Sequence, residues 1–291
     1  MSGLKHLRNR IKTIKSTKKI TKAMQVVSAS KLRRVKDKAE AFDDYSNILS
    51  DIMNDIRLNA KFVELTPNES KFFCNNSAKK SCLLVVMTSE RGLCGSFNSQ
   101  ITKSVRNDIA KFKAQDIKVK LLVVGKKGYD ALKGMYADLI IEYCNIEKEN
   151  FLPISIQVKE KIVGLVESDQ IDSCYLYYNE FKNALTQIMT KRQILPVEVQ
   201  QKQELQNRPS NYEYEGLELI DNLINLYITG VIKYGFLQNK ASEEAARMTA
   251  MDNATRNASE LMDKLTLKLN RSRQAIITTE LTEIISGAEA L

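Results

Sequence analysis

Residues 4–66 read LKHLRNRIKTIKSTKKITKAMQVVSASKLRRVKDKAEAFDDYSNILSDIMNDIRLNAKFVELT, a run of 63 residues without Gly or Pro. A second run, of 51 residues, lies between Gly235 and Gly287. Glycine and proline are the residues that interrupt helices most often, so both runs are predicted to be long helices. At 1.5 Å per residue they would extend roughly 95 and 75 Å, which is longer than a globular domain is wide. Such helices must bury an apolar stripe, and we expect them to pair with each other.

Both runs carry an apolar repeat of 3.5 residues. Alternate steps of three and four residues from Leu4 to Val63 meet 18 positions, of which 13 are apolar, against about eight expected from the 43% hydrophobic content. The same steps from Tyr234 to Thr279 meet 14 positions, of which ten are apolar, against about six expected. A sustained repeat of this period predicts a left-handed coiled coil. The alternative is two amphipathic helices packed on a sheet, which is less favoured because globular helices seldom exceed about 25 residues.

The middle of the chain alternates strand and helix signals. Strand-like segments rich in β-branched residues lie at 82–88, 118–124, 139–143 and 171–178, with a last extended segment at 191–200 around Pro196. Helix-patterned segments lie at 98–115, 129–133 and 154–167. Alternation of this kind, with continuously apolar strands, predicts a mostly parallel sheet covered by helices on both faces.

We therefore expect an α/β fold combined with a long antiparallel coiled coil formed by the N- and C-terminal helices. The predicted domains are an N-terminal coiled-coil helix at 1–66, a central α/β domain with a Rossmann-like sheet at 67–211, and a C-terminal coiled-coil helix at 212–291. The polar stretch 200–211 is the clearest linker.

Charge is distributed unevenly along the chain. Residues 1–40 contain 13 Lys and Arg and two acidic residues, a net charge of +11, so the other 251 residues sum to −2 of the overall +9. The first helix is therefore expected to face an acidic partner. The N-terminus has no apolar signal region, and no apolar run approaches the ~20 residues that span a bilayer. Five cysteines without a CxxC pair indicate a reducing compartment, without a disulfide framework or zinc site.

No catalytic set emerges from the sequence. The turn Glu90–Gly95 follows a predicted strand, where an open α/β sheet can bind a ligand, but it lacks the Lys-Ser/Thr of a P-loop and the third glycine of a dinucleotide fingerprint. Glycines that permit a tight strand-to-helix turn are the favoured interpretation. The single histidine, His6, lies among lysines, which is a poor setting for a general base. We expect no enzymatic activity, cofactor or metal.

Four motifs resemble one family. The last turns, Ile277–Ala290, read ITTELTEIISGAEA, with an Ile-Thr pair, spaced carboxylates and a Gly-Ala. Together with KKITKAM (18–24, continuing to ASK at 29–31), RGLCG (91–95) and ASEEAARM (241–248), they resemble the gamma-subunit family of F-type ATP synthases over the whole length and in order. The bacterial type is the closer match, since 196–215 lacks the regulatory insert with a cysteine pair of the plastid type.

This resemblance implies a rotor shaft. In the family, the terminal helices form an antiparallel coiled coil inside a ring of three catalytic beta and three non-catalytic alpha subunits. The α/β domain lies near the membrane and touches the epsilon subunit and the ring of c subunits. Proton flow turns the c ring and the shaft, and the rotating shaft couples proton flow to ATP synthesis or hydrolysis. The resemblance implies a non-catalytic subunit, peripheral on the cytoplasmic side of the inner membrane and bound to the membrane indirectly.

The resemblance also implies partner contacts for particular residues. The seam turns polar between Lys18 and Ser28, while Ile20, Met24 and Val27 form a shifted stripe. Either this is a tolerated polar interruption, or it presents Met24 to a partner subunit. The other candidates, for each of which a solvated helix face is the alternative, are Arg247, Arg273, Gln274, Thr278, Glu280 and Glu283 for the catalytic ring, and Tyr212 and Glu215 for the c ring.

Two other classes of function compete with the rotor. A coiled coil that binds nucleic acid would use residues 5–38 as a basic arm, with a steep salt dependence of affinity. The absence of aromatic residues from 1–41 leaves bases no stacking platform there. An α/β enzyme would use Arg91–Gly95 as an anion loop, but it lacks a base or nucleophile.

Overall fold

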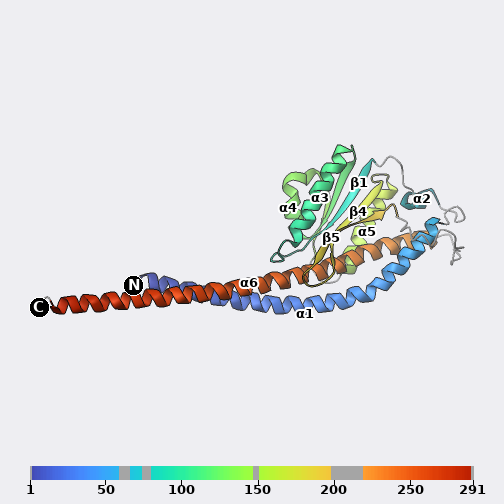
Figure 1. The fold of residues 1–291 in the computed structure, drawn as a ribbon. Helices are drawn as coiled ribbons and strands as arrows, with labels where there is room; N and C mark the ends of the chain where they lie inside the picture. The colour runs from blue at the N-terminus through green and yellow to red at the C-terminus, as the bar shows by residue number, and fades with distance from the viewer. Residues whose placement is uncertain (1, 59–65, 74–79, 147–150, 198–218, 290–291) are drawn as a thin grey trace. The chain divides into compact units, whose positions relative to one another are not determined.

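The computed structural model of the chain describes residues 2–58, 66–73, 80–146, 151–197 and 219–289. The chain divides into two compact units, Met1–Ala29 with Arg247–Leu291 and Ser30–Ala246, which we call the coiled-coil unit and the sheet unit and treat separately. Two long helices contribute to both units: α1 (Ser2–Leu58, 57 residues) and α6 (Leu219–Glu289, 71 residues). Figure 1 colours the elements along the chain.

In the coiled-coil unit, the segments of α1 and α6 run antiparallel. Lys18 pairs with Ser259 and Thr21 with Thr255, so residue numbers rise on one helix as they fall on the other. The predicted seam is confirmed on α1, where every seam position from Leu4 to Ser28 is buried or half-buried. Between these positions, all residues except Met24 are exposed. A period of 3.5 residues thus separates the buried from the exposed side of the helix.

The sheet unit is built on five strands in the order β3-β2-β1-β4-β5. The strands are β1 (Ser81–Met87), β2 (Lys118–Val124), β3 (Ile140–Cys144), β4 (Ser173–Phe181) and β5 (Gln187–Leu195). The first four are parallel, and β5 pairs antiparallel to β4 at one edge. The prediction of a mostly parallel sheet is confirmed.

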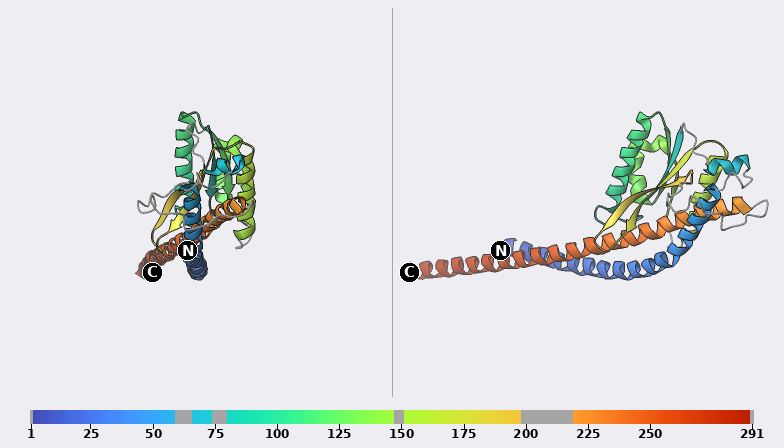
Figure 2. Two further views of the ribbon diagram at one scale, coloured as in Figure 1. Left: turned by 90° about the vertical axis from the view of Figure 1, so that its right-hand side faces the viewer. Right: turned by 45° about the vertical axis from the view of Figure 1, so that its right-hand side comes forward.

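Helices cover both faces of this sheet (Figure 2, left). Alternate residues of β1 point to opposite faces, as in any strand. Cys82, Leu84 and Val86 pack towards α3 (Phe97–Ala114) and α4 (Lys126–Tyr136), which the 3₁₀ turn Ala137–Leu139 follows. The other face, with Leu83, Val85 and Met87, packs towards α2 (Pro67–Phe73), α5 (Phe151–Glu167) and the parts of α1 and α6 in this unit. Both faces of the central strands are fully buried, which explains their continuously apolar sequence.

The first part of α6 lies directly against the sheet. Phe236 stacks on Phe151 of α5 with ring centroids 5.6 Å apart. A Cβ atom at Gly235 would lie 2.7 Å from Cδ2 of Leu176, so only glycine allows this approach. From α1, Met53 and Ile56 enter the same core. Both arrangements considered from the sequence therefore occur: a coil in the coiled-coil unit and helices packed on a sheet in this one.

Several predicted bounds were wrong. The helix predicted at 129–133 was too short, since α4 extends over Lys126–Tyr136. It includes Gly128 and Gly134, although glycine weakens helices. The extended segment predicted at 191–200 is β5, which begins at Gln187 and ends at Leu195. The hairpin between β4 and β5 and the short helix α2 were not predicted. The predicted linker at 200–211 lies outside the described residues.

Candidate functional site

The polar part of the coiled-coil seam is held by hydrogen bonds between the two helices. Lys18 Nζ donates to Ser259 Oγ at 2.6 Å, and the hydroxyls of Thr21 and Thr255 are 2.7 Å apart. One turn further, Gln25 Nε2 donates to Asp252 Oδ1 at 2.9 Å. Buried polar groups cost free energy unless they are paired, and here each partner comes from the facing helix. The seam keeps its register here through polar side chains of α1, while α6 adds the buried Met251 and Ala258 to the same stretch.

A small apolar stripe lies beside this polar seam. The side chains of Ile20 and Val27 are 61% and 54% exposed, and Met24 between them is half-buried. The spacing of four and three residues places the three on one side of α1. The polar interruption therefore does not disturb the coil, and the stripe remains available on its outside. Contact of Met24 with a partner stays a prediction.

The outer side of α1 in this unit is strongly basic. Residues 2–29 contain no acidic residue, and seven of their eight Lys and Arg side chains are exposed. None of these seven forms an ion pair with another residue in the described part of the chain. Their charge is thus not neutralised by ion pairs with the described residues, and it is repulsive unless an acidic surface faces it.

The C-terminal part of α6 continues past the beginning of α1 (Figure 1; Figure 2, right). Ile277, Leu281, Ile284 and Ile285 are 51–71% exposed. Their spacing of four, three and one residues makes one apolar stripe on a helical face. The predicted contacts Arg273, Gln274, Thr278, Glu280 and Glu283 are all exposed on the same part of the helix, and Thr278 Oγ1 donates to Gln274 O at 3.0 Å.

The remaining predicted contact residues do not lie among the exposed residues of the C-terminal part of α6. Arg247 is 7% exposed, so its guanidinium is covered within the chain, and a role in contacting a partner stays a prediction. Tyr212 and Glu215 lie outside the described residues.

A buried charge cluster on α6 of the sheet unit was not predicted as a site. Lys240 Nζ contacts carboxylate oxygens of Glu243 and Glu244, each at 3.0 Å. Burial lowers the pKa of Lys240, but the two carboxylates outweigh it and raise the pKa above its usual value. The i, i+3 and i, i+4 spacing was the signal, but such pairs occur on most exposed helices.

The turn after β1 is occupied by its own side chains. Ser89 Oγ donates to Arg91 O at 2.7 Å, and Asn98 Oδ1 accepts the Ser89 amide at 2.9 Å. Gly95 has a φ of 59° and Leu93 a φ of 64°, so the chain turns sharply here into α3. Glu90 Oε2 accepts a hydrogen bond from the Lys126 amide at 3.1 Å. The negative charge of Glu90 would repel an anion bound at this turn. The interpretation as a tight strand-to-helix turn agrees with this geometry.

Two further searches covered the described residues only. No group of three or more His, Cys, Asp or Glu side chains is placed to hold a metal ion within 2–58, 66–73, 80–146, 151–197 and 219–289. Over the same part of the chain, every helix is too short or too polar to cross a membrane.

Chains with this fold occur in solved ATP synthase structures. The central stalk and c-ring structure of the mitochondrial ATP synthase from Tetrahymena thermophila contains a chain 28% identical to this one, with a TM-score of 0.60, over 81% of this chain and 99% of that one. A chain of the Euglena gracilis mitochondrial ATP synthase, 20% identical, matches the fold with a TM-score of 0.67 over 99% of this chain and 94% of its own. The fold is thus of the class found in ATP synthase central stalks.

Sequence comparison identifies the family. The chain matches the ATP synthase family over residues 3–291. It is 52% identical to the ATP synthase gamma chain of Rickettsia felis over 291 residues, and 52% identical to that of Rickettsia prowazekii over 291 residues, with all of both chains covered in each case. The chain belongs to the ATP synthase gamma chain family, as the four sequence motifs predicted.

Proposed function

We propose that the chain is the non-catalytic central-stalk subunit that transmits torque between a membrane c ring and a catalytic hexamer of alpha and beta subunits. The observation that carries this proposal is the 52% identity to bacterial gamma chains over the full length. A shaft must resist bending, and the two described helices pair through a seam whose polar positions are hydrogen-bonded across the coil.

The basic side of α1 supports a contact with the catalytic ring. Seven exposed Lys and Arg side chains without an ion pair among the described residues fit a ring that presents acidic loops. Electrostatic contact of this kind favours particular orientations but leaves both surfaces hydrated, so that the shaft can leave one orientation and enter the next. The exposed apolar stripe at Ile277–Ile285 fits an apolar bearing surface at the end of the shaft.

The rest of the assignment follows the same proposal. The central α/β domain (67–211) would contact the epsilon subunit and the c ring, with Tyr212 and Glu215 at the c-ring contact, and the helices of 1–66 and 212–291 would form the shaft. The subunit would lie on the cytoplasmic side of the inner membrane and be held there through its partners. It would bind no nucleotide and no nucleic acid.

Reconstitution tests this function. The purified chain should hydrolyse no ATP, whereas its addition to purified alpha and beta subunits should produce a complex with ATPase activity. Addition of that complex to vesicles containing the c ring and its membrane partners should produce ATP-driven proton pumping. ATP hydrolysis by the pure chain, or pumping that does not depend on the chain, would contradict the proposal.

A further inference from the structure

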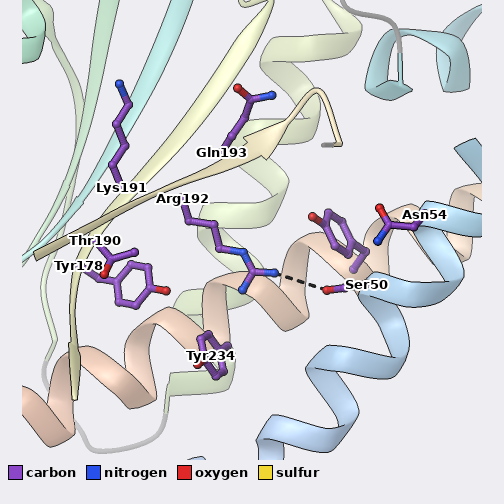
Figure 3. A pocket seen from close by; sticks show the side chains of 9 residues that line it. Ser50, Asn54, Tyr178, Thr190, Lys191, Arg192, Gln193 and Tyr234 are labelled. Atoms are coloured by element: carbon purple, nitrogen blue, oxygen red, sulfur yellow. Dashed lines mark hydrogen bonds between the residues drawn. The ribbon is translucent and has the colours of Figure 1, made fainter. Parts of the chain in front are cut away.

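The sheet unit contains a polar pocket that its packing leaves unfilled. A cavity of about 310 Å³ lies between α1, α6 and the strands β4 and β5, with Ser50, Asn54, Tyr178, Arg192, Tyr227 and Tyr234 in its wall (Figure 3). Thr190 and Arg192 point to this side of β5, and Lys191 points to the other side of the sheet, where it contacts Asp108 at 2.9 Å. A volume of this order suits a small ligand.

Arg192 provides the charge of this pocket. Its Nη2 donates to Ser50 Oγ over a long 3.4 Å, and the guanidinium also forms a hydrogen bond with the Tyr178 side chain. Its guanidinium carbon lies 5.8 Å from the centre of the Tyr234 ring. Arg192 forms no ion pair with any carboxylate in the described part of the chain. A guanidinium has five N–H donors and no acceptor, so most of its hydrogen-bonding capacity remains for a group inside the pocket.

Asn54 adds a second unused polar group. Its side chain is only 7% exposed, and its amide makes no hydrogen bond with any residue that the structure describes. Ser50 and Asn54 lie one turn apart on α1 and face the same pocket (Figure 3). Among the described residues, Arg106 Nε and Asn179 Oδ1 are the side-chain atoms that are buried without a hydrogen-bond partner, so solvent in the pocket reaches the Asn54 amide. A ligand that accepts a hydrogen bond would satisfy it.

The tyrosines of the pocket add neutral hydroxyl groups, of which that of Tyr234 already donates to Asp43. Burial raises the pKa of Tyr178 above its usual value, against the opposing effect of Arg192. Burial also raises the pKa of Tyr234 to about 12, with further contributions from Asp43 and Glu180. Both phenols therefore keep their protons at neutral pH. Because Asp43 and Glu180 are close enough to act on Tyr234, a ligand with two full negative charges is less favoured than one with a single charge.

We propose that this pocket binds a small oxyanion of single charge, a carboxylate or a singly protonated phosphate, between the Arg192 guanidinium and the Asn54 amide. Arg192 is the charged side chain of the lining that points into the pocket, and its guanidinium and the Asn54 amide both offer N–H donors there, so an oxygen-rich anion complements them. Charge-assisted hydrogen bonds from a guanidinium to such a group are the strongest that the lining can make.

The proposal is tested on the full chain by titration with inorganic phosphate and with acetate, each compared with chloride at equal ionic strength. The readout is the ¹H–¹⁵N NMR signal of the Asn54 side-chain amide, assigned by its loss in Asn54→Leu. One or both probes should shift it with saturation, and the probe that does so identifies phosphate or carboxylate as the source. Arg192→Gln should weaken binding at least about tenfold. Lys118→Gln, which removes an exposed positive charge elsewhere, should leave affinity unchanged.

A second variant keeps the test decisive if Arg192→Gln fails to fold. Asn54→Leu removes an amide that has no partner among the described residues, so without anion its thermal midpoint should be at or above that of the wild type. Its affinity for the anion, followed by calorimetry, should fall. Two results would overturn the proposal. One is that phosphate and acetate each shift the Asn54 amide signal no more than chloride does. The other is that the wild type and the variants Arg192→Gln and Asn54→Leu bind the anion with equal affinity.

Discussion

Gly235 offers a sharp test of how α6 packs on the sheet. A Cβ atom there would lie 2.7 Å from Cδ2 of Leu176, 3.4 Å from Sδ of Met87 and 3.6 Å from its Cε. Both neighbours are fully buried in the core, so neither has space to move aside. Overpacking of this kind costs about 1–3 kcal/mol. Replacing a helical glycine by alanine gains about 1 kcal/mol in helix propensity, so Gly235→Ala should destabilise the protein by about 0–2 kcal/mol.

The matched control is Gly164→Ala on α5. Gly164 is exposed within a helix, and a Cβ atom there would meet nothing within 4 Å. This variant should therefore gain the propensity term alone, about 1 kcal/mol. Urea unfolding of both variants, followed by circular dichroism at equal protein concentration, should separate them by about 1–3 kcal/mol. Equal stabilisation by the two substitutions would refute the close approach of α6 to Leu176.

Three further predictions concern other parts of the molecule. Replacing Thr21 and Thr255 by Val, singly and together, should reveal a favourable coupling of about 0.5–1.5 kcal/mol in unfolding experiments, and additive effects would contradict the hydrogen bond between the helices. Burial raises the pKa of Asp108, but hydrogen bonds from Lys191 and Tyr177 outweigh it and lower the pKa below its usual value. A lowered pKa in the folded state stabilises the protein above the unfolded value, near pH 4, and this contribution is lost as pH falls through the folded pKa. Asp108→Asn should therefore destabilise the protein at neutral pH and lose its effect in acid, and a difference that is independent of pH would count against the pairing. In a reconstituted complex, Met24→Lys should reduce the ratio of protons pumped to ATP hydrolysed more than Ala23→Lys does, with assembly unchanged. Equal coupling in the two variants would count against a partner contact of Met24.

The coiled coil was predictable because its rule is periodic. Every described seam position of α1 from Leu4 to Ile56 is buried or half-buried, including Lys18, Thr21 and Gln25, where the residue types alone argue against burial. The 3.5-residue period carried the prediction through these polar residues. What the sequence did not reveal is which residue of α6 each would face, since that depends on the register of the two helices.

The β4–β5 hairpin was missed because its turn lacks glycine. The backbone amides of Leu185 and Thr186 both donate to Asn183 Oδ1, at 2.9 and 2.8 Å. An Asn side chain can close a turn in this way, so Asn183 was a usable signal. Helix α2 also had one, since Thr66 and Glu69 form a capping box in which Glu69 Oε2 accepts the Thr66 amide at 2.6 Å.

Some features of the candidate site could also be predicted from the sequence, and others could not. The basic side of α1 could be read from the sequence, because its residues lie outside the heptad seam. The apolar residues near the end of α6 were also visible in the sequence, but they are exposed because α6 continues past the beginning of α1. The Arg192 pocket could not be read from the sequence, since its residues come from α1, β4, β5 and α6, and only the folded sheet unit brings them together. No local pattern marks a cavity whose walls are far apart in sequence.

The central claim is that this chain turns as a shaft within a complex, and rotation itself tests it most directly. Leu152 on α5 is 46% exposed, so Leu152→Cys offers a site for a reporter bead, with Cys74 replaced and the four described cysteines buried. With the alpha and beta subunits fixed to a surface and ATP supplied, the bead should rotate in one direction with three pauses per turn, one for each catalytic subunit. A bead that stays still while the same complexes hydrolyse ATP would contradict the account.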